Sequence, residues 1–246
     1  MNEFKSQNQG YQQPPSWQQQ GGWGGMIART AAEATLPERL AFVRKVYALF
    51  FAATLFAVGG VMLGFAIPDL MIAVAMHPYI GFFALIGGVM GAQAVRLKPG
   101  INLFALFAFT TLTGVIFSPL LYILGRENPS SILEAGVLTV GIFGGLTAYV
   151  FLSKRDFSFL RGMVMTGLTV VCIFALLNFF IIGSTSLRFG ISAAALLLFS
   201  GFVLYDTSNI IRRYPTNEYV AGALDLYLDA FNIFIALLRI LNAGRR

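Results

Sequence analysis

Seven long apolar segments, separated by short polar connections, constrain this chain more than any other feature. An α-helix needs about 20 residues to cross a bilayer, and each segment is close to that length. Because the apolar runs are continuous rather than alternating, they predict helices and exclude the strands of a membrane β-barrel. The predicted spans are residues 46–67, 78–95, 101–124, 132–152, 163–182, 189–211 and 219–241.

A shortage of charge supports the same fold class. The chain is 57% hydrophobic and only 11% charged, whereas a soluble domain is about 45–50% apolar and about 25% charged. We therefore predict an all-α membrane protein, a seven-transmembrane-helix bundle in the lipid bilayer. The net charge of +6 is spread between the apolar segments, which indicates topology signals and argues against nucleic acid as a partner.

The chain divides into a polar tail and a transmembrane domain. Residues 1–45 begin with a Gln-, Gly- and Pro-rich stretch that predicts a flexible cytoplasmic tail. Residues 46–246 form the predicted seven-helix domain. Lys and Arg gather in the tail and in the even-numbered connections, so we place the N-terminus in the cytoplasm. Whether the seventh segment crosses fully, and hence the side of the C-terminus, stays open, because Arg239 lies at its end and two more arginines follow it.

Three carboxylates lie deep within the apolar segments and are the candidate functional residues. Asp206 lies in the sixth segment, and Asp225 and Asp229 lie in the seventh. Asp225 and Asp229 are four residues apart and so share one helix face. Like charges in a low dielectric cannot both ionise at low cost, so we expect one proton to be retained. We also expect the seventh helix to lie at the centre of the bundle, sheltered from lipid.

Three roles are compatible with this cluster: Ca²⁺ binding by Asp206 and Asp229, proton sensing, and a static polar network. Depth along the helices does not decide whether Asp225 or Asp229 faces Asp206. Arg96, at the end of the second segment, is the candidate basic partner, since a buried carboxylate is costly without one. A single histidine, His77, and a single cysteine leave no zinc site or histidine-dependent protease, so we expect neither an enzyme nor a bound cofactor.

Several motifs in a fixed order resemble the Bax inhibitor-1 family, also called the transmembrane Bax inhibitor motif family, over residues 44–241. The Gln-rich tail is similar to that of bacterial members. The matching stretches are GVIFSPLL (114–121), AGVLT (135–139), FGGLTAY (143–149), SKRDFSFL (153–160), LYDT (204–207) and LYLD (226–229), followed by Asn232 and LLR (237–239).

The resemblance implies a seven-helix fold with the seventh helix central, in the inner (plasma) membrane of a bacterial cell. It implies a pH-sensitive, calcium-permeable leak channel gated by a diaspartyl latch. The latch pair would be Asp206, from the Tyr-Asp motif, and Asp229, from the Tyr-Leu-Asp motif, with Arg96 as partner. The resemblance also implies an alternative, in which the protein binds and modulates a membrane-anchored AAA protease and transports nothing.

Overall fold

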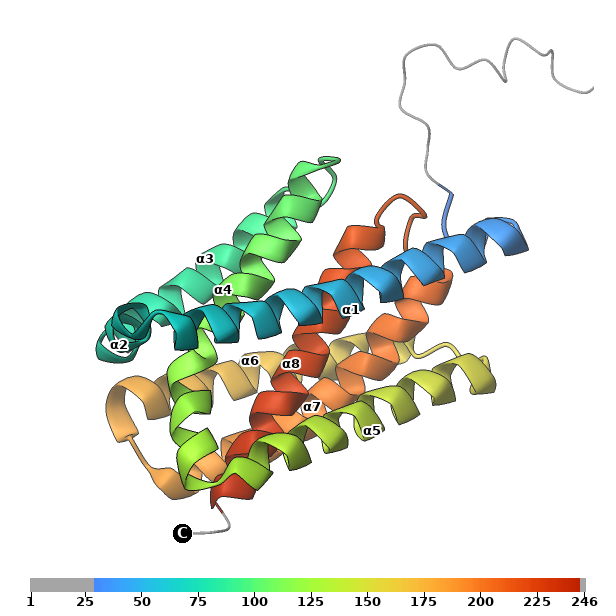
Figure 1. The fold of residues 1–246 in the computed structure, drawn as a ribbon. Helices are drawn as coiled ribbons and strands as arrows, with labels where there is room; N and C mark the ends of the chain where they lie inside the picture. Colours follow the sequence, from blue (N-terminus) through green and yellow to red (C-terminus); the bar gives the residue numbers. More distant parts are fainter. Residues whose placement is uncertain (1–28, 244–246) are drawn as a thin grey trace, which may run out of the picture.

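The computed structural model describes residues 29–243, and helices make up almost all of this part of the chain (Figure 1). The first 28 residues of the predicted tail lie outside the described residues. A 3₁₀ turn (Ser158–Leu160) precedes α6, and a π-helical turn (Asn178–Ile182) follows it. The helices are α1 (Leu36–Ala66), α2 (Pro68–Met76), α3 (Pro78–Ala94), α4 (Ile101–Glu127), α5 (Pro129–Ser153), α6 (Arg161–Leu177), α7 (Thr185–Arg212) and α8 (Tyr219–Ala243).

Within residues 29–243, five helical stretches are long and apolar enough to cross a membrane: α1, α4, α5, the stretch Ser158–Ile182 and α7. α2 and α3 pass the same test only as a pair, bent by 95°. α8 is not among these stretches, and it carries Asp225, Asp229 and Arg239. Large apolar side chains such as Phe104 and Leu197 are exposed on the outside of the bundle. This is the surface of a helical membrane protein, while the count of seven spans stays a prediction.

The first predicted connection contains a helix that the sequence analysis did not anticipate. Residues 68–76 lie between the first two predicted spans and are too few to cross a bilayer. In the structure they form the helix α2. Pro68 and Pro78 each occupy the first position of a helix, where the missing N–H of proline costs nothing. The two prolines therefore divide one apolar stretch into two helices with a sharp bend at His77.

The first long helix begins at Leu36 rather than at the predicted Val46. Its start is set by polar residues that an apolar pattern does not reveal. The backbone N–H of Thr35 donates to the Glu38 carboxylate at 3.0 Å, and Pro37 occupies the first turn, both of which favour a helix N-terminus. Residues 36–45, which were assigned to the flexible tail, therefore extend α1 beyond the apolar run.

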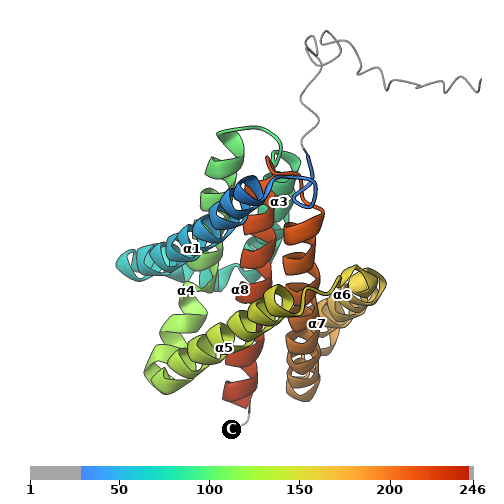
Figure 2. The same ribbon diagram turned by 90° about the vertical axis from the view of Figure 1, so that its right-hand side faces the viewer.

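α8 runs through the middle of the bundle in both views (Figures 1 and 2). It packs against α1, α4, α5 and α7. Buried residues occur along its whole length, from Val220 to Leu238, whereas α6 buries only Val164. A helix with internal carboxylates is thus enclosed by other helices, as its composition requires.

Two glycines let α1 and α4 approach each other closely. A Cβ atom added at Gly60 would clash with the backbone oxygen of Thr111, and one at Gly114 would clash with that of Ala57. Small residues at such positions allow helix backbones to touch in a membrane, where packing rather than hydrophobic burial drives association.

The segment before α1 lies along the connection between α7 and α8. Residues 29–34, which we call the N-terminal segment, form backbone hydrogen bonds with residues 212–216. The N–H of Ala31 donates to the Tyr214 carbonyl at 2.9 Å, and the N–H of Thr216 donates to the Arg29 carbonyl at 3.2 Å. Ala31 is fully buried in this contact. The N-terminal segment is therefore held against the connection that joins the two aspartate-bearing helices.

Candidate functional site

The packing of α7 on α8 brings the three aspartates into one region at the centre of the bundle. Asp206 lies on α7, while Asp225 and Asp229 lie one turn apart on α8. Asp229 is the most enclosed, with only 3% of its surface exposed, and Asp206 and Asp225 are partly buried.

The carboxyl groups of Asp206 on α7 and Asp229 on α8 lie close enough for their charges to interact. In the described part of the chain, no hydroxyl or N–H group reaches the buried Oδ2 atom of Asp229. Two ionised carboxylates in this position would repel each other in a low dielectric, with no donor at Asp229 Oδ2 to offset the repulsion. The pair therefore requires a proton, or a cation, between its oxygens.

Asp225 has a different environment, although it is only one turn from Asp229. The Tyr214 hydroxyl donates to its Oδ2 atom, and the Gln93 side-chain amide donates to its Oδ1 atom at 3.3 Å. Burial and the nearby Asp225 carboxylate raise the pKa of the Tyr214 phenol, so the phenol stays protonated and remains a donor. The depth estimate could not separate the two acids of α8, and the structure gives them different partners.

Arg96 follows α3 and forms an ion pair with Glu218, with 3.8 Å between Arg96 Nε and Glu218 Oε2. Within the described residues, this ion pair takes the place of the expected direct contact with the aspartate pair. Arg96 lies near enough to Asp225 to attract its charge. The guanidinium group of Arg96 thus lies beside the three aspartates and not between Asp206 and Asp229.

Sequence reasoning missed three residues of this region: Gln93, Tyr214 and Glu218. Gln93 offered a signal, because it is the only polar side chain with hydrogen-bonding groups within the apolar run 78–95 apart from Tyr79. Tyr214 and Glu218 lie in the α7–α8 connection, and their inward positions depend on how that connection folds.

The tyrosine of the Tyr-Leu-Asp motif anchors α8 to α4. The hydroxyl groups of Tyr227 and Thr113 form a hydrogen bond, and both residues are almost completely buried. The ring of Tyr227 also stacks on Phe231, with 5.7 Å between the ring centroids. Asp229 is two residues further along the same helix, so this anchor fixes the position of its backbone.

The residues that the structure describes contain no group of three or more His, Cys, Asp or Glu side chains that could hold a metal ion. Asp206 and Asp229 alone offer two carboxylates, whereas Ca²⁺ takes 6–8 oxygen ligands. These two carboxylates alone supply fewer ligands than a Ca²⁺ ion takes.

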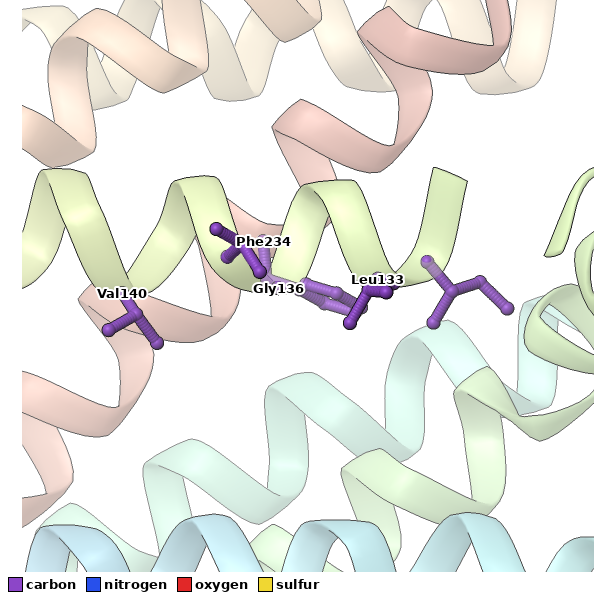
Figure 3. Close-up of a pocket in the computed structure, with 6 residues that line it drawn as sticks. Leu133, Gly136, Val140 and Phe234 are labelled. Atoms are coloured by element: carbon purple, nitrogen blue, oxygen red, sulfur yellow. The ribbon is translucent and has the colours of Figure 1, made fainter. Parts of the chain in front are cut away.

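An apolar surface pocket on α5 is unrelated to this polar region. Its volume is about 550 Å³, and it is lined by α5 residues with Phe234 of α8 (Figure 3). Leu133, Gly136 and Val140 belong to its wall, and no lining side chain is ionisable. The pocket is an apolar groove on the lipid-facing surface and offers no chemistry for ions.

Comparison with known proteins agrees with the motifs and the fold. The family profile described as "Inhibitor of apoptosis-promoting Bax1" matches residues 39–246. An uncharacterized protein of Helicobacter pylori is 34% identical over 206 residues, which cover 83% of this chain and 87% of the relative. An uncharacterized membrane protein of Vibrio cholerae is 37% identical over 175 residues, covering 69% of this chain and 78% of the relative. Bax inhibitor 1 of Schizosaccharomyces pombe is 34% identical over 218 residues, which cover 86% of this chain and 79% of the relative. The chain therefore belongs to the Bax inhibitor-1 family of membrane proteins.

Proposed function

We propose that the protein is a pH-sensitive, calcium-permeable leak channel in which Asp206 and Asp229 form the latch. The observation that carries the proposal is the carboxyl pair of Asp206 and Asp229, in which the buried Asp229 Oδ2 atom has no hydrogen-bond partner among the described residues. A pair in this state is held together by a shared proton, so its stability depends on the proton concentration.

The charge on the pair sets the proposed cycle. With one shared proton, α7 and α8 stay attached and the path is closed. When that proton leaves as pH rises, two negative charges repel in a poorly solvated site and the contact loosens. When both carboxyls are protonated at low pH, the pair is neutral and no longer attracts a cation.

The neighbouring polar residues give this pair a second layer of control. Asp225 is tied to α3 by Gln93 and to the α7–α8 connection by Tyr214. Arg96, held by Glu218, lies close enough to Asp225 for their charges to attract. In the proposed open state, Arg96 leaves Glu218 for a newly ionised aspartate, because an ionised buried carboxylate without a positive partner is costly.

The proposed topology has seven crossings, with α8 as the last one and the N-terminus in the cytoplasm of a bacterial cell. Four Lys- and Arg-bearing segments meet at one end of the bundle, which supports this orientation. The N-terminal segment contacts the α7–α8 connection, Arg213 pairs with Asp156 of the α5–α6 connection, and Arg96 after α3 pairs with Glu218.

Ca²⁺ flux into liposomes, measured between about pH 5 and 8 with an entrapped indicator, tests the proposal. Wild-type flux should increase as pH rises, and Asp206→Asn or Asp229→Asn should flatten this response, because an amide cannot lose the shared proton. Asp69→Asn is the matched control, since it removes an exposed carboxylate at the start of α2 and leaves all three aspartates of α7 and α8 in place. A double variant, D206N with D229N, that keeps the full pH response would exclude the latch.

A further inference from the structure

Two arginines converge on a small pocket at the end of the bundle opposite the N-terminal segment. The pocket has a volume of about 140 Å³ and lies between the start of α7, the end of α8 and the second half of α4. Figure 1 shows these helix ends at the bottom of the bundle, far from the start of α1. Arg188 of α7 and Arg239 of α8 both line the pocket and are close enough for their charges to repel.

Neither guanidinium has an anionic partner within residues 29–243. The ion pairs in this part of the chain join Arg96 to Glu218 and Arg213 to Asp156. An arginine side chain offers five N–H donors, and neither Arg188 nor Arg239 uses them on another described residue. Both arginine side chains are exposed at this pocket, so their charges are accessible to an anion that approaches from outside the bundle.

The start of α7 adds to the positive potential. Arg188 lies in the first turn of this 28-residue helix, and that turn contains no acidic residue. Unpaired backbone N–H groups give a helix N-terminus a partial positive charge, which disfavours a cation and favours an anion there. The position of Arg188 therefore runs against the helix dipole unless an anion lies beside it.

The walls of the pocket indicate what kind of anion fits. Leu120 of α4 and Phe189 of α7 provide apolar surface, while Thr185 and Asn242 provide polar groups beside the arginines. A site that combines two guanidinium groups with apolar walls at the end of a membrane helix bundle suits a phosphate attached to acyl chains. Arginine binds phosphate through two parallel hydrogen bonds, which a planar guanidinium provides and an ammonium does not.

We propose that this pocket, which we call the arginine pocket (lined by Arg188 and Arg239), binds the phosphate headgroup of an anionic phospholipid. The lipid phosphate supplies the counter-charge that the described residues lack. Its glycerol and acyl chains then lie along the apolar walls and the exposed side chains of the outer surface.

Native mass spectrometry of the detergent-purified full chain tests this proposal with phosphatidylglycerol, phosphatidylcholine and inorganic phosphate as probes. The wild type should retain phosphatidylglycerol in preference to phosphatidylcholine. Arg188→Gln and Arg239→Gln should each weaken this retention by about tenfold or more. Arg126→Gln is the matched control, because Arg126 ends α4 at the same end of the bundle but stacks on Tyr122, at 5.0 Å, outside the pocket.

The rise in melting temperature on adding each probe gives a second readout and shows that each variant is folded. Arg188→Lys and Arg239→Lys keep the charge and should retain part of the binding, which guards against a folding defect in the Gln variants. Equal retention of phosphatidylglycerol by R188Q, R239Q and R126Q overturns the proposal. Stabilisation by inorganic phosphate without stabilisation by phosphatidylglycerol also overturns it, because the pocket would then be a site for a free anion.

Discussion

Tyr214, just beyond the end of α7, donates its phenol hydrogen to the carboxylate of Asp225 on α8. The backbone carbonyl of the same tyrosine accepts the N–H of Ala31. One residue of the connection therefore links the N-terminal segment to an acid of the central helix. We therefore expect a disturbance of the N-terminal segment to reach Asp225 through these two hydrogen bonds.

Removing the Tyr214 hydroxyl should destabilise the protein. In Tyr214→Phe, Asp225 keeps only the amide of Gln93 as a donor, and a buried acceptor that loses its partner costs about 1–3 kcal/mol. We expect a lower melting temperature in detergent, measured by scanning fluorimetry. Tyr149→Phe, at an exposed tyrosine of α5, is the control and should melt as the wild type does; an unchanged melting temperature in Y214F would contradict the prediction.

Proline at position 31 should loosen the contact between the N-terminal segment and the α7–α8 connection. Ala31→Pro deletes the N–H that donates to the Tyr214 carbonyl and adds bulk at a fully buried position. Hydrogen exchange followed by mass spectrometry should show faster exchange of the Thr216 amide than in the wild type. Ala32→Ser, which changes an exposed side chain next to Ala31 and keeps the backbone N–H groups, should leave that exchange rate unchanged, and slow exchange in A31P would rule out the coupling.

A methyl group at Gly60 should separate α1 from α4, whereas the same group one residue earlier should not. The Cβ atom of Gly60→Ala would meet the backbone oxygen of Thr111, which has no room to move, and Gly59→Ala would meet nothing within 4 Å. Overpacking of this kind costs about 1–3 kcal/mol, while Ala is favoured over Gly in a helix by about 0.5–1 kcal/mol. Melting temperatures should therefore fall for G60A and hold or rise for G59A, and equal values would argue against the close approach.

Acid should destabilise the α5–α6 connection through Asp156. The backbone N–H of Ser158 and the Arg213 guanidinium hold the pKa of the Asp156 carboxyl below its usual range. A depressed pKa in the folded state adds stability above the unfolded pKa, about 3.9, and this stability is lost as pH falls through the folded pKa. Because the pair is half-exposed, the effect is at most about 1 kcal/mol.

A plot of melting temperature against pH between about 6 and 3 measures this contribution. Asp156→Asn should lower the melting temperature at pH 6 and decline less steeply in acid. Glu127→Gln changes an exposed carboxylate that forms no ion pair with another described residue, so it should follow the wild-type curve. If D156N and wild type decline in parallel, Asp156 contributes nothing to acid sensitivity.

The helices were predictable because each apolar run is long enough to need a membrane-spanning element, and the ends of several runs are set by proline or charge. α2 was missed because its nine residues were too short for a span, although they are apolar. The start of α1 was placed too late because Thr35 and Glu38 act through hydrogen bonds that hydropathy does not record. Helix positions thus follow from solvent preference, and helix boundaries follow from local polar contacts.

The three aspartates were visible because a carboxylate in an apolar run is rare and costly. Their separate partners were not visible, because a spacing of four residues places Asp225 and Asp229 on one face without saying what lies opposite. Tyr214 and Gln93 reach Asp225 from two other parts of the chain. Such contacts depend on how the α7–α8 connection folds over the end of α8, which no periodicity encodes.

The interlocked glycines of α1 and α4 have a consequence for how the bundle can rearrange. The backbone of each helix occupies the space that a side chain on the other would need. We therefore expect α1 and α4 to move together as one rigid unit. Two other helices are packed less tightly: α3 buries only Gly81 and Ala92, and α6 buries only Val164. If helices move relative to α8, we therefore expect α3 and α6 to move more than α1 and α4.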